Sequence, residues 1–450
     1  MPSRSGVRRS FSSLFDIGLG MSACRRRTAF PSLALFLLMA AFMVTKTGRD
    51  ALYFQRDGFF ELPKAYLGIA ILAGPAAAFT LSVMRFAGPR RSRVFTTLVA
   101  AAVQAAFYWV AEPGGGLRMT LVWLAIPLQY GVLLSQAWLL AADLLEAAPR
   151  PALPELYSVL GASSMFGGLT GAAAARSLGS LVEAEALFLA GSALLAVAAV
   201  VMSLAQATCR AAGMSEDPSG APAPPGGRPP GLREMAQVLR QRYPMLLAMV
   251  GVVGAVVGVL IEFQFYWSVS DPAATPRDNV QLFANFYLWL NGAALLVQLL
   301  GMPPLQRRVG VRGSLLVLPV ALCGGAALMA VSASTLARAG LRIAESGLKS
   351  SIHRSNWEQA YLPLERRARA MSKLLVDGVA ARVGEGIAAI MLLVWLRGTG
   401  GDISRQDTVW IAYALLVCSA VWLALIVRMG PSLASLSPGE FRAEIMVPDG

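Results

Sequence analysis

The sequence predicts an all-α membrane protein with about twelve transmembrane helices, divided into two halves of six. Hydrophobic residues make up 56% of its 450 residues and charged residues only 14%, and the mean hydropathy is +0.57. Soluble domains carry about 25% charged residues. Apolar runs of about 20 residues recur along the chain, and runs of this length cross a bilayer as helices. This composition argues against a soluble multidomain enzyme.

The apolar runs define the expected spans. They lie at about 30–48, 64–84, 94–111, 118–142, 156–177, 183–207, 244–268, 281–303, 313–333, 336–361, 373–396 and 407–428. A Pro/Gly-rich segment, Gly213–Gly231, separates the sixth run from the seventh and is typical of a flexible linker. The predicted parts are an N-terminal tail (1–28), a first bundle (29–207), a linker (208–243), a second bundle (244–430) and a C-terminal tail (431–450).

The charge distribution predicts which way the chain crosses the membrane. The net charge is 39 − 26 = +13. In a soluble protein such an excess would suggest nucleic acid, but in a membrane protein Lys and Arg gather on cytoplasmic loops. We therefore expect a cell (inner) membrane protein with both termini, and the linker, in the cytoplasm and with no nucleic acid partner. The four scattered Cys and the single His predict neither a disulfide framework nor a metal site.

A short motif repeats at equivalent places in the two halves. Arg85–Arg90 follows the second span and Arg307–Arg312 follows the eighth, and both read R-x-x-G-x-R. The Gly allows a tight turn while the arginines hold the cytoplasmic face. Two six-helix halves with such a repeat are typical of major-facilitator-type transporters, whose substrate site lies between the halves near the midplane. The same layout is predicted here.

Charged residues inside the first and seventh spans are the first candidates for a site, because charge in a membrane is costly and usually functional. Lys46 and Asp50 are four residues apart and can pair, which would leave Arg49 free to face a ligand. Glu262 would pair with a lysine or arginine while the substrate is absent. The alternatives are that Lys46 and Arg49 anchor the span at the external interface, and that Glu262 lies at that interface beside aromatic residues.

The tenth span is the most polar. Its polar residues share one helix face, and they are Arg338, Arg342, Glu345, Lys349, His353 and Asn356. This face is interpreted as the wall of a water-filled cavity, although structural ion pairs with neighbouring helices would give the same pattern. Because Arg342 and Glu345 can pair at a spacing of three, we expect Lys349 and Arg354 to contact the ligand.

The eleventh span opens with Lys373 and carries Asp377 four residues later, followed by Arg382 and Glu385. Glycines accompany these charges, and the fifth span, its counterpart in the first half, has glycines as well. We expect them to serve close helix packing rather than ligand contact. They are Gly378, Gly384 and Gly386 in the eleventh span, and Gly161, Gly167, Gly168 and Gly171 in the fifth.

Signatures of other functions are missing from the sequence. It has no Walker phosphate loop, no Ser/His/Asp set and no zinc spacing. We therefore expect no enzyme activity and no cofactor, and transport would draw on a gradient or on exchange rather than on ATP hydrolysis. A coupling proton or cation is a further expected partner.

Several patches resemble the ATP:ADP antiporters of plastids and intracellular bacteria. The patches are Lys46-Thr-Gly-Arg49-Asp50, Gln136-Ala-Trp138 with Asp143 and Leu156–Gly161, Leu260-Ile-Glu262, and Trp357–Leu364 with Ser372-Lys373 and Val376-Asp377. The resemblance implies nucleotide binding and exchange, and it places Arg49, Glu262 and Lys373 at three of that family's functional positions. The sequence departs from the family at the fourth position, since residues 119–142 contain no acid.

The predicted function is secondary transport of a nucleotide, by ATP/ADP-type exchange, or of a similar phosphorylated anion through a cationic central cavity. The predicted substrate-binding residues are Lys46, Arg49, Asp50, Glu262, Lys349, Arg354, Lys373 and Asp377. Two alternatives are a major-facilitator transporter of another organic anion, and a membrane scaffold or sensor that kept the fold without transport.

Overall fold

The structure is a computed structural model, and it describes most of the chain. The described residues are 4–54, 58–111, 116–145, 153–211, 240–271, 273–332, 334–361, 364, 372, 374–399, 403 and 405–434. Most of the predicted linker, the C-terminal tail and Lys373 lie outside this part.

Helices make up nearly all of the described residues. The first half contains α1 (Arg4–Tyr53), α2 (Gly58–Val110), α3 (Leu117–Leu145), α4 (Leu153–Gly179) and α5 (Ala186–Ala211). The second half begins with α7 (Arg242–Val269), α8 (Pro276–Leu296), the π-helix η2 (Val297–Gly301) and α9 (Met302–Val331). It continues with α10 (Thr335–Leu348), the π-helix η3 (Lys349–His353), α11 (Arg354–Gln359), the π-helix η4 (Leu374–Ala380), α13 (Ala381–Gly398) and α14 (Arg405–Ala434).

Each of the twelve predicted spans lies on one or more of these helices, so the predicted all-α membrane fold is confirmed. The second and third spans both lie on α2, and the tenth is divided among α10, η3 and α11. Within the described residues, eight helices are long and apolar enough to cross a membrane by length and composition. The tenth span falls short of this standard because it is charged and because η3 interrupts it.

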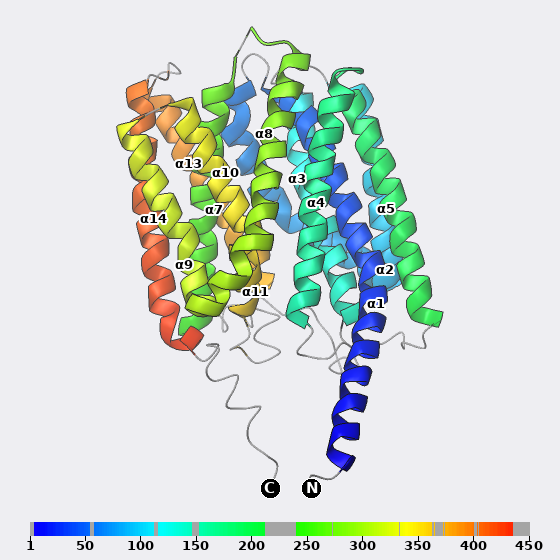
Figure 1. Ribbon diagram of the computed structural model, residues 1–450. Coiled ribbons are helices and arrows are strands. Elements are labelled where there is room, and N and C mark those ends of the chain that lie inside the picture. Colours follow the sequence, from blue (N-terminus) through cyan, green and yellow to red (C-terminus); the bar gives the residue numbers. More distant parts are fainter. Residues whose placement is uncertain are drawn as a thin grey trace.

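The helices stand side by side in one bundle, and both termini lie at the same end of it (Figure 1). We call this the termini end and the opposite one the far end. An even number of spans requires such an arrangement, whereas the side of the membrane that the termini end faces stays a prediction. Helix α1 begins at Arg4, so it extends beyond the bundle through most of the residues predicted as an N-terminal tail.

The two halves meet along two seams. On one, α8 packs against α1 and α4, and on the other, α13 packs against α2. Glycines bring the backbones together inside the halves. A Cβ atom at Gly167 or Gly171 of α4 would overlap the backbone of α1, and one at Gly384 of α13 would overlap the backbone of α7. The prediction that these three glycines serve helix packing is confirmed.

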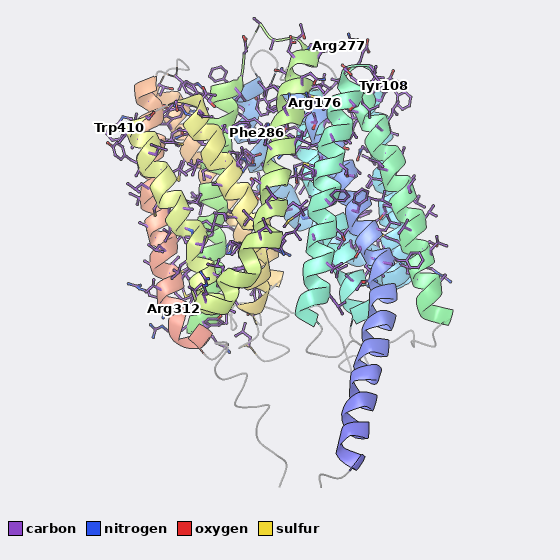
Figure 2. All side chains as sticks on the ribbon, viewed as in Figure 1. Tyr108, Arg176, Arg277, Phe286, Arg312 and Trp410 are labelled. Atoms are coloured by element: carbon purple, nitrogen blue, oxygen red, sulfur yellow. The ribbon has the colours of Figure 1, made fainter. Side chains whose placement is uncertain are left out.

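The second R-x-x-G-x-R motif makes a turn within α9 at the termini end. Gly310 has φ 66° and ψ −172°, a backbone conformation with positive φ that favours glycine. The Ser314 hydroxyl donates to the Gly310 carbonyl over 2.8 Å. Arg312 lies at the termini end, against Gly430 of α14 (Figure 2). The predicted tight turn is confirmed here, and the side chains of its counterpart, Arg85–Arg90, lie outside the described part.

Candidate functional site

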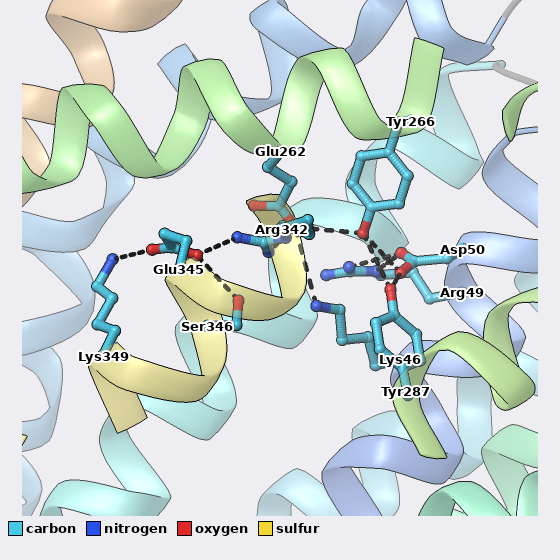
Figure 3. A network of polar contacts seen from close by, with 10 residues as sticks. All are labelled: Lys46, Arg49, Asp50, Glu262, Tyr266, Tyr287, Arg342, Glu345, Ser346 and Lys349. Carbon is cyan, nitrogen blue, oxygen red and sulfur yellow. Dashed lines mark hydrogen bonds and ion pairs between the residues drawn. The ribbon is translucent and has the colours of Figure 1, made fainter. Parts of the chain in front are cut away.

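A polar network joins the two halves inside the bundle (Figure 3). It connects α1 of the first half with α7, α8, α10 and η3 of the second. Its members are Lys46, Arg49, Asp50, Glu262, Tyr266, Tyr287, Arg342, Glu345, Ser346 and Lys349. The helices that carry them pack together inside the bundle, and this packing turns the polar side chains toward one another. Such an arrangement is expected of ionisable groups in a membrane.

Asp50 is the centre of the far part of the network. Its side chain is fully buried. The Arg49 guanidinium donates to Oδ1 from Nε at 2.7 Å and from Nη2 at 2.5 Å. Two hydroxyls from the other half donate to Oδ2: that of Tyr266, at 2.8 Å, and that of Tyr287. A buried carboxylate must be paired and hydrogen-bonded in this way, so Asp50 ties the halves together.

Aromatic rings surround the buried Arg49–Asp50 pair. The Arg49 guanidinium carbon lies 4.6 Å from the centroid of the Trp123 ring, a distance at which a cation is attracted to an aromatic face. The Phe54 ring stacks on Tyr266 with centroids 4.0 Å apart, again across the two halves. The far part of the network is therefore sealed by apolar packing as well as by hydrogen bonds.

Lys46 pairs with a carboxylate of the other half and not with Asp50 of its own helix. Its Nζ atom lies 3.8 Å from Oε1 of Glu262 and 4.6 Å from the centroid of the Tyr287 ring. The expected pairing of Lys46 with Asp50 is therefore wrong, and so is the expectation that Arg49 is free, because Arg49 pairs with Asp50. The reason is that α7 and α8 offer Lys46 a carboxylate and an aromatic face, while the tyrosines and Arg49 occupy Asp50.

The middle and near parts of the network form a row of alternating charge. Arg342 donates from Nη2 to Glu262 Oε1 at 2.9 Å and from Nη1 to Glu345 Oε2 at 2.7 Å. Lys349 Nζ lies 3.0 Å from Glu345 Oε1. With Lys46 beyond Glu262, the order is base, acid, base, acid, base, so the row has one more positive charge than negative. The expected pairing of Arg342 with Glu345 is confirmed, as is that of Glu262 with a lysine and an arginine.

The residue of this row that lies nearest the termini end, Lys349, is the most exposed. The Arg342 and Glu345 side chains are 10% and 3% exposed, whereas that of Lys349 is 48% exposed. Yet Lys349 points toward the interior, because a Cβ at Gly258 of α7 would lie only 3.2 Å from its Nζ. Lys349 therefore lies beside α7 while half of its side chain remains exposed. Arg354, one residue beyond η3, is exposed too.

The eleventh span contributes a second ion pair. Arg382 Nη1 lies 2.6 Å from Oε2 and 2.8 Å from Oε1 of Glu385, on α13. Their side chains are 33% and 18% exposed. Asp377 lies on the π-helix η4, and its side chain, like Lys373, is outside what the structure describes. The expected roles of Lys373 and Asp377 therefore stay predictions.

Three members that join different helices were not predicted to be part of the site. Arg342 was assigned to a structural pair, but it also bridges to Glu262 of α7. Tyr266 lies four residues after Glu262, so the i,i+4 spacing could have identified it. Tyr287 has no comparable signal, since the sequence does not show that α8 lies against α1 at Asp50.

No family model and no curated protein matches the sequence. Solved structures do match the fold. The nucleoside transporter NupG is similar with a TM-score of 0.57 and 14% identity, over 89% of this chain and 98% of that one. A mutant of the same transporter gives the same TM-score and identity, with 99% of that chain covered.

A bacterial homolog of the human lysosomal transporter Spinster, in an inward-facing and unoccupied conformation, has a TM-score of 0.53 and 14% identity. The match covers 91% of this chain and 98% of that one. These likenesses confirm the major-facilitator-type fold. They do not bear on the resemblance to the ATP:ADP antiporters, which stays a prediction.

Proposed function

We propose that this protein is a secondary transporter that moves an organic anion, a nucleotide or a similar phosphorylated compound, across the membrane by alternating access. The observation that carries the proposal is the row from Lys46 through Glu262, Arg342 and Glu345 to Lys349. It crosses from one half to the other, and it has a surplus of positive charge. Fold-level likeness to solved transporters, one of them for nucleosides, supports the proposal.

The chemistry of the row favours an anionic substrate. Arg342 uses two guanidinium nitrogens on two carboxylates. Phosphate and carboxylate groups of a substrate can accept the same pair of hydrogen bonds, and such charge-assisted contacts are strong in a site of low dielectric constant. Glu262 and Glu345 would then occupy, in the empty protein, the places that substrate oxygens take when it binds.

Transport requires the substrate to favour one arrangement of the halves over another. Lys349, half exposed, and Arg354 are the first cations that an anion would meet from the termini end. An anion that reaches Arg342 would release Glu262, and Glu262 also holds Lys46 of the first half. The ion pair between Lys46 and Glu262, which joins the halves, would weaken. The two halves could then rock about the site.

Uptake into proteoliposomes tests the proposal. Labelled ATP, ADP and AMP would be offered to the protein reconstituted with and without internal nucleotide, so that exchange is separated from ion-coupled uptake. We expect uptake by the natural protein and its loss in Glu262→Gln and Arg342→Gln. Arg397→Gln, which removes an exposed arginine from the last turn of α13, is the matched control and should transport normally.

A panel of unlabelled competitors extends the test to another organic anion, the second candidate. The absence of an acid from residues 119–142, where the ATP:ADP antiporters have one, favours this candidate. Competition by a sugar phosphate or a dicarboxylate, but not by nucleotides, would identify it. If no anion is transported and none alters the thermal unfolding of the purified protein, both transport proposals are wrong. The protein is then better interpreted as a membrane scaffold or sensor that kept the fold without transport.

A further inference from the structure

A second site lies on the seam between the halves, away from the polar network. It is a hollow of about 560 Å³ between the last turns of α4 and the first turns of α8, at the far end of the bundle. None of the residues that line it belongs to the network. Because α4 is part of the first half and α8 part of the second, whatever occupies the hollow contacts both halves.

Two arginines line this hollow. Arg176 is in the last turn of α4, and Arg277 is the second residue of α8. Figure 2 shows both at the far end of their helices. Both side chains are exposed, and among the described residues neither guanidinium takes part in an ion pair or a hydrogen bond. The rim therefore presents two guanidinium groups that are not engaged in a described ion pair.

The acid at the rim is occupied elsewhere. Asp278 accepts hydrogen bonds from the backbone N–H of Thr275 at 3.1 Å and from its hydroxyl at 2.6 Å. This is the capping box that begins α8. The Asp278 carboxylate thus caps the helix terminus and forms no described ion pair with either arginine, although its negative charge remains at the rim. Ser177 and Ser180 add hydroxyl groups to the lining beside Arg176.

The hollow continues from this polar rim to an apolar floor. Ala173 of α4 and Leu288 of α8 also line it, and along their helices both lie farther from the far end than the arginines do. Leu288 follows Arg277 by eleven residues on the same helix, about 16 Å at 1.5 Å per residue. The hollow is thus elongated along the seam, charged at the membrane surface and apolar toward the interior of the membrane.

We propose that the hollow binds an anionic phospholipid. The phosphate lies between Arg176 and Arg277, and one acyl chain follows the groove between α4 and α8 toward Leu288. Arg176, Arg277 and Asp278 give the rim a net charge of 2 − 1 = +1, which matches the single negative charge of a phosphodiester, and the apolar floor matches the chain. A soluble phosphate ion would use the rim alone and gain nothing from the floor.

A lipid in this position would stabilise the arrangement of the halves that the structure shows. Their far ends already meet here, since the Gln281 amide donates to the Arg176 carbonyl at 2.9 Å and Gly179 packs against Val280. A molecule that binds this closed seam more tightly than an open one shifts the equilibrium toward the closed form. The inference concerns the lipid and does not depend on which substrate is carried.

Thermal unfolding of the purified full-length protein in nanodiscs tests the inference without any substrate. Discs of phosphatidylglycerol and of phosphatidylcholine would be compared for the natural protein, the double variant Arg176→Gln/Arg277→Gln, each single variant and Arg397→Gln. We expect phosphatidylglycerol to raise the unfolding temperature of the natural protein by several degrees. The shift should fall by about half in each single variant, nearly vanish in the double variant and persist in Arg397→Gln.

Two results would overturn it. One is an equal phosphatidylglycerol shift in the natural protein and in the single variants, which remain informative even if the double variant does not fold. The other is an equal shift when inorganic phosphate is added to phosphatidylcholine discs, which would show that the rim binds a free anion. Native mass spectrometry supplies an independent readout, the number of phosphatidylglycerol molecules retained per protein.

Discussion

The two ends of the polar network use the same chemical groups in opposite surroundings. At Asp50 the carboxylate is fully buried, paired with Arg49, and held by tyrosines of the other half. At Lys349 a cation of the same network is 48% exposed. One network thus has a buried, fully paired end and a half-exposed end, with Glu262 and Arg342 between them. Under the proposed function, the buried end would act as a closed gate and the half-exposed end as a binding surface.

Removing the Asp50 carboxylate should have the largest effect on stability. Asp50→Asn leaves the Arg49 guanidinium buried without its counter-charge, which typically costs about 3–5 kcal/mol. We expect a correspondingly large loss in thermal unfolding in detergent. The double variant Arg49→Gln/Asp50→Asn should recover much of the lost stability, because no unpaired charge remains. A double variant as unstable as Asp50→Asn would show that the loss does not come from the unpaired Arg49 guanidinium.

Glu262 lies between the two ends and should show an intermediate loss. Its side chain is 17% exposed and contacts both Lys46 and Arg342, so Glu262→Gln should cost about 3 kcal/mol, the lower limit for a buried pair. Transport should be abolished, because the substrate would no longer exchange with an internal carboxylate. Glu385→Gln, which removes a carboxylate from the separate α13 pair, is a matched control for both measurements.

Removing a tyrosine hydroxyl that donates to Asp50 should have a smaller effect on stability. It should also show whether this hydrogen bond keeps the far end closed. Tyr287→Phe removes one hydrogen bond to a charged group, worth about 1.5–3 kcal/mol. Because that bond crosses the halves, the variant should also open the far end, which cysteine labelling at Phe54→Cys would detect as faster modification. The control is Tyr53→Phe, which removes a hydroxyl from the residue next to Phe54 on α1. This variant should leave the labelling rate unchanged.

Lys349 should show the smallest stability effect and a large functional one. A half-exposed ion pair contributes about 0–1 kcal/mol, so Lys349→Gln should unfold almost like the natural protein. Substrate affinity should nevertheless fall, and its dependence on ionic strength should weaken, because an exposed cation attracts an anion in a salt-sensitive way. If Lys349→Gln destabilises as much as Asp50→Asn, the contrast between the two ends is wrong.

The pairing of charges shows where sequence reasoning was sufficient. Arg342 and Glu345 were predicted to pair because they lie three residues apart on one helix, and the structure confirms it. Arg49 and Asp50 are adjacent in sequence, yet their pairing was not predicted. Nothing local indicates that Tyr266 and Tyr287, more than 200 residues away, would fix the Asp50 carboxylate in place.

Hydropathy, glycine geometry and helical spacing were enough to predict the spans, the two halves, the turn at Gly310 and the helices that carry charge. Each of these signals acts over a few residues of the chain. The contact of Lys46 with Glu262, the burial of Asp50 under two tyrosines, and the position of Arg176 and Arg277 at one hollow come from the packing of distant helices. Such contacts depend on which helices the packing brings together, and side-chain spacing along one helix carries no information about its neighbour.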